Sequence, residues 1–192
     1  MAKLRTARAY RRVKRPWTRV SRKKKKSFVR GAPNVRVVMF DNGNLRKQFP
    51  VQLDLISRVR LQVRDNALEA ARQTAVRHLD IICGKENWFM KIRAVPHHVI
   101  REKPLATGAG ADRFQQGMGH GFGKPYGHAC QVKIGKILMS FYVNQEHVAA
   151  AKEAARKATC KMPMRCETLV KKNPLFKEQK VEEAEVAVAE TN

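Results

Sequence analysis

Residues 66–95, NALEAARQTAVRHLDIICGKENWFMKIRAV, decide the fold class because they contain a helix followed directly by a strand. Apolar side chains recur at helical spacing and predict one buried face, formed by Leu68, Ala71, Ala75, Leu79 and Ile82. The sequence predicts a capping box at the start, with Asn66 as the cap and Glu69 reaching back to it. Gly84 predicts the end of the helix.

The rest of the central region alternates between strand and turn patterns. After the helix, residues 87–95 alternate apolar and polar side chains and predict a strand, which residues 97–100 continue into a long loop. Before it, residues 35–40 (VRVVMF) predict a strand that ends in a turn at residues 41–44. Residues 51–63 predict two strands separated by a bulge or break near Ile56 and Ser57, where the alternation changes phase.

A second strand-and-helix group follows the loop. Residues 128–134 and 136–143 predict two strands around a tight turn at Gly135. A helix capped by Asn144 should follow, and its buried stripe is made of small residues, namely Val148, Ala151, Ala155 and Ala158. Residues 161–163 (KMP) stop it, and residues 164–170 can form a last strand.

Grouped strands with two helices predict an α+β fold, with a mixed, mostly antiparallel sheet and both helices packed on it as an α/β sandwich. Three parts are expected along the 192 residues: a basic arm at 1–33, an α+β globular domain at 34–172, and a polar to acidic tail at 173–192. The domain should carry an extended loop at residues 101–127, which holds seven of the chain's 11 glycines. A loop of this length is typically functional or disordered.

Charge indicates the kind of partner. The formal net charge is +24, and the first 30 residues hold 14 basic and no acidic side chains. A polyanion such as nucleic acid is therefore expected, and the arm should order only against it. The arginines near residue 60 should form one basic face. The side chains expected to bind RNA are Arg5, Arg8, Arg11, Arg12, Arg15, Trp17, Arg19, Arg22, Lys23, Lys24, Lys25, Arg30, Arg58, Arg60, Arg64, His97 and His98.

No pattern supports catalysis or a cofactor. The glycines fail both phosphate-loop templates, since Gly123 and Lys124 are followed by Pro125 and the dinucleotide spacing breaks at Phe122. The six histidines, the scattered carboxylates and the four cysteines match no catalytic or metal-ligating arrangement, so no enzyme, cofactor or metal site is predicted. The cysteines should be reduced and mostly buried, as in a cytosolic protein, and no segment suits a membrane span.

One long stretch carries a family likeness. Residues 96–127, PHHVIREKPLATGAGADRFQQGMGHGFGKPYG, followed by QVKIGKILMS and a helix ending in KATCKMP, resemble the archaeal and eukaryotic large-subunit ribosomal protein family L-ten-e. That family is the counterpart of bacterial L-sixteen within one universal family. The likeness covers roughly residues 2–170, and the acidic end from about Glu178 falls outside it.

The resemblance implies a structural constituent of the large ribosomal subunit, located in the cytoplasm, that binds large-subunit ribosomal RNA. It also implies that the loop extends toward the peptidyl transferase centre and the tRNA acceptor arms and helps to position tRNA. Neighbouring ribosomal proteins and subunit-assembly factors are further implied partners. The loop positions that the resemblance assigns to this role are Arg101, Lys103, Gly108, Gly110, Arg113, Gly117, Met118, His120 and Lys124. The alternative reading from the charge alone is a free basic protein that binds DNA or messenger RNA.

Overall fold

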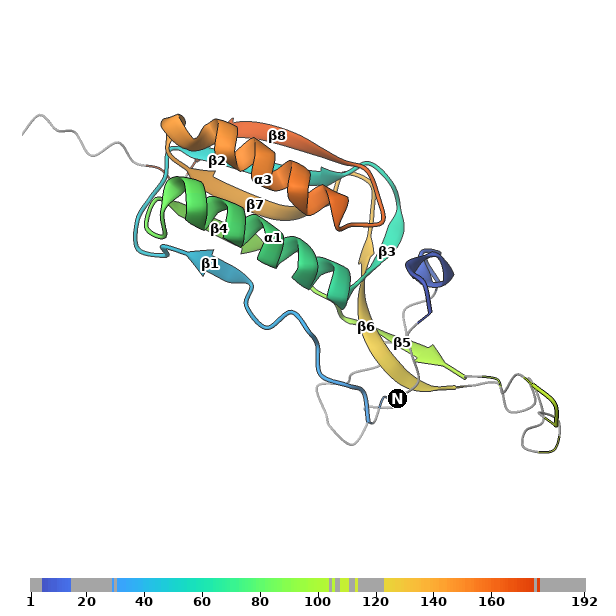
Figure 1. The fold of residues 1–192 in the computed structure, drawn as a ribbon. Coiled ribbons are helices and arrows are strands. Elements are labelled where there is room, and N and C mark those ends of the chain that lie inside the picture. The colour runs from blue at the N-terminus through green and yellow to red at the C-terminus, as the bar shows by residue number, and fades with distance from the viewer. Residues whose placement is uncertain are drawn as a thin grey trace, which may run out of the picture.

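The computed structural model describes residues 5–14, 29, 31–103, 105, 108–110, 113, 123–174 and 176. Two antiparallel sheets and two long helices make up the fold (Figure 1). The five-stranded sheet has the order β1(Asp41–Gly43), β4(Trp88–Ile92), β7(Ile137–Val143), β2(Val51–Ser57) and β8(Cys166–Lys172). The three-stranded sheet has the order β3(Leu61–Arg64), β6(Lys124–Val132) and β5(His98–Glu102). The predicted α+β class is confirmed, and every strand pair described is antiparallel.

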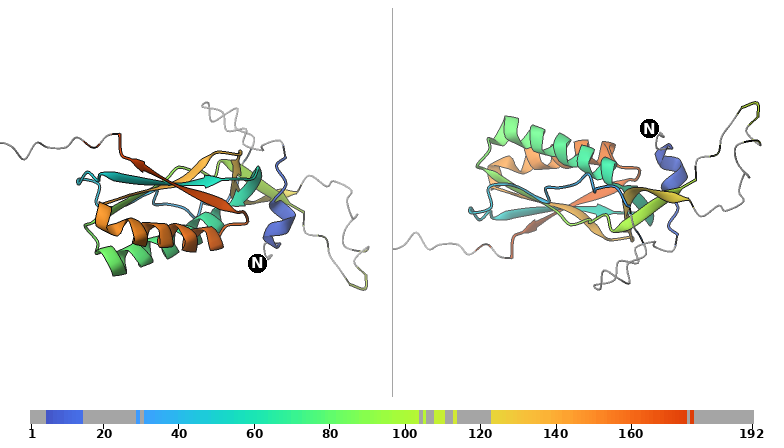
Figure 2. Two further views of the ribbon diagram at one scale, coloured as in Figure 1. Left: turned by 90° about the horizontal axis from the view of Figure 1, so that it is seen from above. Right: turned by 90° about the horizontal axis from the view of Figure 1, so that it is seen from below.

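Helices α1(Asp65–Cys83) and α3(Val148–Cys160) lie side by side on one face of the five-stranded sheet, whose other face carries no helix (Figure 2). The main core lies between the helices and this sheet, where Leu53, Met90 and Phe141 are fully buried. The helix interface is built from alanines, which let the two helices approach closely. The buried alanines are Ala71 and Ala75 on α1, and Ala151, Ala154, Ala155 and Ala158 on α3.

The predicted break within residues 51–63 is confirmed and separates the two sheets. β2 joins the five-stranded sheet and shifts register against β7 between Leu55 and Ile56, whereas β3 pairs only with β6. The strands on either side of Gly135 also belong to different sheets, since β6 lies in the three-stranded sheet and β7 in the five-stranded one. The tight turn at Gly135 therefore joins two sheets and does not form a hairpin.

The strand predicted at residues 35–40 was wrong. Val37 is buried, but the adjacent Val38 and Met39 are 80% and 56% exposed, so this run of apolar residues does not alternate in space. Pairing with β4 begins only where the Phe40 carbonyl accepts a hydrogen bond of 2.8 Å from the Ile92 amide. β1 then occupies Asp41–Gly43, where a turn was predicted.

Both predicted side-chain caps were wrong. α1 begins at Asp65, whose carboxylate accepts a 2.8 Å hydrogen bond from the Asn66 amide, and Glu69 pairs with Arg72 and does not reach back. Asn144 makes no side-chain cap either, and a short 3-10 helix, η3(Gln145–His147), precedes α3. At the other end of α1, Gly84 terminates the helix as predicted.

Two burial predictions also need correction. Ile82 was predicted to lie on the buried stripe of α1 but is 53% exposed, and Cys83 is buried in its place. Cys83, four positions after Leu79, continues the buried stripe, since residues three and four apart are both neighbours on a helix surface. Of the four free cysteines, Cys83 and Cys130 are buried, Cys166 is half-buried and Cys160 is exposed, so the thiols are less uniformly buried than predicted.

The second sheet extends away from the helices and ends at the long loop (Figure 1). β5 reaches Glu102 and β6 starts at Lys124, so both ends of the segment predicted as loop, 101–127, belong to strands. The loop proper is residues 103–123. No helix in the described part of the chain is long and apolar enough to cross a membrane.

Candidate nucleic-acid interface

Part of the basic arm is held against the second sheet. Residues 5–14 include a short 3-10 helix, η1(Ala7–Tyr10), and their backbone carbonyls accept four hydrogen bonds from the sheet, one of them from Arg64 and three from two glutamines. The Gln62 amide donates to Arg11 O at 3.0 Å, the Gln62 side chain donates to Tyr10 O at 3.2 Å, and the Gln131 side chain donates to Lys14 O at 2.8 Å. The prediction that the arm orders only against a partner was therefore wrong for these residues.

The docking uses backbone groups, so the cationic side chains of the arm remain outside. Two glutamines supply donors from strands β3 and β6, which alternation alone marked only as polar positions. Five basic side chains of this segment are exposed, namely Arg5, Arg8, Arg11, Arg12 and Lys14. The backbone bonds therefore hold the arm while its cations stay exposed, which suits contact with phosphates.

Side-chain contacts tie the arm to the stem of the loop. The Tyr10 hydroxyl donates to the Glu102 carboxylate, which also forms an ion pair with Arg5. Arg64 donates to Arg5 O at 2.9 Å, and its guanidinium lies 5.8 Å from the centre of the Tyr10 ring. Burial, and next the hydrogen bond to Glu102, raise the pKa of Tyr10 to about 12. Sequence reasoning missed this network, although Glu102 ends strand β5 as its one acidic residue, directly after Arg101.

The stem of the loop is shaped by glycine. At its mouth Glu102 pairs with Lys124, and the register shifts between Ile100 and Arg101. Gly123 has φ +76°, and a Cβ there would lie 2.8 Å from the carbonyl carbon of Glu102. Only glycine fits this close approach without a shift of backbone. Glycine therefore allows residues 103–123 to leave the end of the sheet at this point.

The predicted loop residues lie partly within the described chain. Arg101, Arg113 and Lys124 are exposed, Lys103 is half-buried, and Gly108 and Gly110 both have positive φ. Gly117, Met118 and His120 lie outside the described residues. The same holds for Arg15, Trp17, Arg19, Arg22, Lys23, Lys24, Lys25 and Arg30 of the arm.

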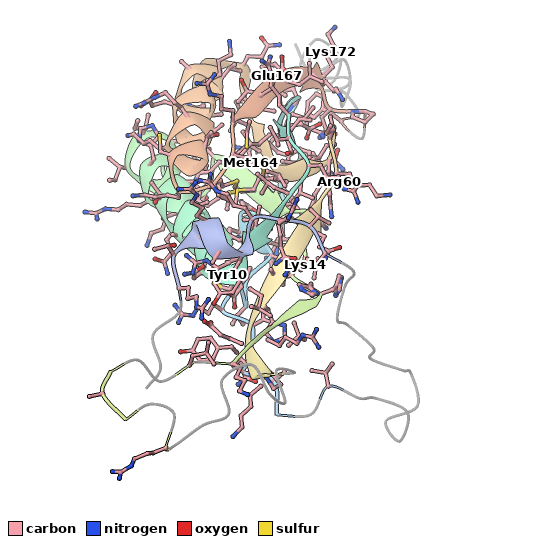
Figure 3. All side chains as sticks on the ribbon, turned by 90° about the vertical axis from the view of Figure 1, so that its right-hand side faces the viewer. Tyr10, Lys14, Arg60, Met164, Glu167 and Lys172 are labelled. Atoms are coloured by element: carbon pink, nitrogen blue, oxygen red, sulfur yellow. The ribbon has the colours of Figure 1, made fainter. Side chains whose placement is uncertain are left out.

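A second group of cationic side chains lies where the β2–β3 turn meets the β6–β7 turn and the residues just before β8, at the end of the molecule seen in Figure 3. Arg58 and Arg60 are exposed in the turn between β2 and β3. The Arg58 amide donates to Arg165 O at 3.4 Å, and the amide of Ser57 donates to Lys136 O at 3.0 Å. Arg58 also pairs with Glu167 at 2.9 Å. Arg60 and Lys14 are labelled at this same end in Figure 3.

The arginines near residue 60 do not form one face, contrary to the sequence reasoning. Arg58 and Arg60 lie in a turn, whereas Arg64 ends β3 and is engaged with the arm. The bulge and the change of sheet turn these side chains away from one another. Together they nevertheless place cations at both ends of β3.

The two adjacent histidines separate, as a strand requires. His97 is exposed and His98 is 9% exposed. Burial, and then the positive charges of Arg101 and His128, lower the pKa of His98. Both effects favour the neutral imidazole of His98. His128 Nε2 lies 2.6 Å from Pro33 O, so the last residue of the arm also contacts β6.

The described side chains offer no cluster of metal ligands. Among these residues no three of His, Cys, Asp or Glu are gathered so that they could hold a metal ion. Acidic residues form ion pairs with arginines of the same helix, as Glu69 does with Arg72 and Glu153 with Arg156. Arrangement and charge together therefore provide a surface for polyanion binding.

These features define a basic α+β protein of the RNA-binding class, with a helix-covered sheet as its body and its cations displayed on an arm, a loop stem and connecting turns. The chain belongs to the family described as Ribosomal protein L16p/L10e, whose model matches residues 16–169. The resemblance carried by residues 96–127 is thereby confirmed.

Archaeal relatives match nearly the whole chain. A protein of Archaeoglobus fulgidus is 46% identical over 166 residues, which cover 86% of this chain and 92% of the relative. One from Methanococcus maripaludis is 40% identical over 170 residues, covering 88% and 95%. One from Caldivirga maquilingensis is 40% identical over 167 residues, covering 85% and 92%. Each of these relatives is named Large ribosomal subunit protein uL16.

Proposed function

We propose that this chain is a structural, non-enzymatic constituent of the large ribosomal subunit, where it binds large-subunit ribosomal RNA and adjoins other ribosomal proteins. The relatives' shared name and the family match support this role. The observation that carries it is the docked arm, because residues 5–14 attach through backbone carbonyls and leave their cations exposed. No observation favours the alternative of a free DNA- or messenger-RNA-binding regulator.

The body acts as a rigid platform that fixes where the charges stand. Contacts from arginine and lysine to phosphates set position and orientation without reading sequence. Specificity then comes from RNA shape and from unstacked bases. The RNA-binding parts are the arm of residues 1–33 and, within the domain at residues 34–172, the turn with Arg58 and Arg60.

The finer part of the proposal concerns the loop. We infer that residues 103–123 extend toward the peptidyl transferase centre and the tRNA acceptor arms and help to position tRNA. The stem supports this inference, since Arg101 and Lys124 stand exposed at its mouth and Arg113 is exposed further out. Subunit-assembly factors are proposed partners on the same grounds of family membership. Peptide-bond formation itself is assigned to RNA and not to this chain.

The test replaces residues 104–122 with a short glycine linker, which keeps the β5–β6 pairing at Glu102 and Lys124. Large subunits reconstituted with this variant should retain the protein in a high-salt sucrose gradient but bind aminoacyl-tRNA poorly. Purely electrostatic attachment is driven by the release of counterions and weakens as the salt concentration rises. Retention at high salt therefore separates an integral component from an adventitious one.

A matched control replaces the exposed helix cations Arg77 and Lys152 with glutamine and should leave tRNA binding unchanged. Failure of the wild-type chain to sediment with large subunits would overturn the ribosomal role. Normal tRNA binding by subunits that contain the loopless variant would overturn only the role of the loop.

A further inference from the structure

The docked arm creates a groove on the body. A hollow of about 350 Å³ lies between η1, strand β3, the first turns of α1 and the residues that follow α3. Figure 3 looks onto this end of the molecule and shows η1 close to the ends of both long helices. The groove exists only because the arm folds back on the sheet. No local sequence pattern therefore predicts it.

The groove is cationic. Arg11 from the arm, Arg64 from β3 and Lys161 after α3 line it, and no aspartate or glutamate does so among the described residues. Arg11 and Lys161 are exposed, whereas Arg64 is half-buried. The N-terminal end of the 19-residue helix α1, at Asn66 and Ala67, also lines the groove, but the Asp65 carboxylate that accepts the Asn66 amide offsets its partial positive charge, so the three cationic side chains dominate. The walls therefore favour an anion.

The remainder of the lining is apolar, with two polar atoms that lack partners. Ala67, Ala70 and Met162 supply apolar surface. Arg64 Nε and Asn66 Oδ1 are buried and have no hydrogen-bond partner within the described chain. Buried donors and acceptors are normally satisfied, so one donor and one acceptor beside an apolar wall indicate a ligand with both kinds of polar group.

We propose that this groove binds one unstacked nucleotide of single-stranded ribosomal RNA. The phosphate lies among Arg11, Arg64 and Lys161, and the base or ribose lies against Ala67, Ala70 and Met162, within reach of Arg64 Nε and Asn66 Oδ1. The volume, near the lower end of the about 300–1,000 Å³ typical of small-molecule sites, fits a single nucleotide and excludes a duplex. The inference rests on the proposed RNA-binding function and adds a site and a substrate class to it.

Two variants probe the groove from different sides. Ala70→Phe fills it without changing any charge. The double variant R11Q/K161Q removes two of its cations but keeps the backbone bond between Gln62 and Arg11. The matched control is R77Q/K152Q, which makes the same change in net charge on exposed helix faces away from the groove. Circular dichroism and thermal unfolding establish that each variant is folded.

The probes are a mixed-sequence single-stranded oligoribonucleotide of about six nucleotides, an RNA duplex, and adenosine monophosphate. Ala70→Phe should weaken single-strand binding about tenfold while leaving duplex binding within about twofold. For R11Q/K161Q the slope of log affinity against log salt on single strands should fall by about 0.7, the value for the one phosphate contact that is lost. Binding of the monophosphate with the same dependence on Ala70 would show that the groove recognises a nucleotide by itself.

Equal losses in R11Q/K161Q and R77Q/K152Q, or equal losses on single strands and duplex in Ala70→Phe, would overturn the groove inference. If Ala70→Phe failed to fold, the salt slope of R11Q/K161Q would still decide it. If the wild-type protein binds ribosomal RNA and every groove variant binds it equally well, this inference alone is refuted. Wild-type protein that binds no RNA refutes the proposed function.

Discussion

The phenol of Tyr10 donates a hydrogen bond to the carboxylate of Glu102, although 92 positions separate the two residues in sequence. Arg5 pairs with the same carboxylate. The contact therefore fixes the start of the basic arm to the strand that leads into the long loop. Two regions proposed to contact RNA are thus held at a defined distance from each other by one acidic side chain.

Tyr10 should titrate later than an ordinary tyrosine. Its folded pKa of about 12 lies above the ordinary value of 10.0, because burial and the Glu102 hydrogen bond favour the neutral phenol. The stability that the phenol contributes is therefore complete below pH 10 and is lost as the pH rises through 12. Ultraviolet absorbance of tyrosinate should show a late step that disappears in Tyr10→Phe. Tyr126→Phe is the control, and a late step that survived in Tyr10→Phe would contradict the assignment.

The same substitution should loosen the arm. In Tyr10→Phe the carboxylate of Glu102 loses the phenol hydrogen bond and keeps its ion pair with Arg5, so residues 5–14 should detach more often. Limited trypsin digestion at Arg11 and Arg12 should then be faster than in the wild type, while cleavage at Arg77 within α1 stays slow. Unchanged cleavage in the arm would show that the backbone bonds to Gln62 and Gln131 suffice.

Gly123 should not tolerate a side chain. Gly123→Ala places a Cβ 2.8 Å from the Glu102 carbonyl carbon at a φ of +76°, so the free energy of unfolding should fall by about 1–2 kcal/mol. Urea denaturation measures this change. Gly127→Ala is the matched control, because a Cβ there meets nothing within 4 Å. Equal effects of the two substitutions would argue against a specific clash at the loop stem.

Asp54 organises a buried polar group on the helix-free side of the main sheet. Its carboxylate accepts hydrogen bonds from Ser140 at 2.6 Å and from Gln52 at 2.8 Å, and Asp54 is 1% exposed. Asp54→Ala leaves these donors without an acceptor and should lower the free energy of unfolding by about 2 kcal/mol. Asp54→Asn retains an acceptor and should cost clearly less in the same denaturation experiment. Equal costs would indicate that charge, through Lys171 at 3.8 Å, dominates instead.

The alanine interface should resist enlargement. Ala155 is fully buried on α3, where it faces the core and α1. Ala155→Leu should force the helices apart and reduce the free energy of unfolding by about 1–3 kcal/mol. Ala149→Leu adds the same volume at an exposed position of the same helix and should change stability little. Thermal unfolding of the two variants provides the comparison, and similar shifts would mean that α3 is not closely packed.

Local pattern predicted the elements well where one face is buried throughout. Leu68, Ala71, Ala75 and Leu79 marked the core side of α1, and the phase change at Ile56 and Ser57 marked the break that separates β2 from β3. The pattern failed at residues 35–40, because an apolar run at the edge of a sheet packs irregularly. It also failed at the helix starts: α1 begins one residue earlier than predicted, at Asp65, and η3 precedes α3.

The candidate interface was only partly predictable. Charge counting selected the basic arm and the loop, but nothing local indicated that Gln62 and Gln131 would bind the arm's carbonyls. The groove at Arg64 is likewise a product of two segments far apart in sequence. Hydrogen bonds of this kind depend on positions in space, and single-sequence periodicity carries no information on them.

The amino-acid sequence by itself determined the polyanion-binding character, the α+β class and the family, because charge, periodicity and the motif at residues 96–127 are properties of the chain read in order. Only the tertiary structure decided that residues 51–63 feed two different sheets, that the arm folds back on the second of them, and that Glu102 joins arm to loop. The reason is physical: periodicity reports which face of an element is buried, whereas strand partners and long-range contacts are settled by the competition among all elements for the same core and the same hydrogen bonds.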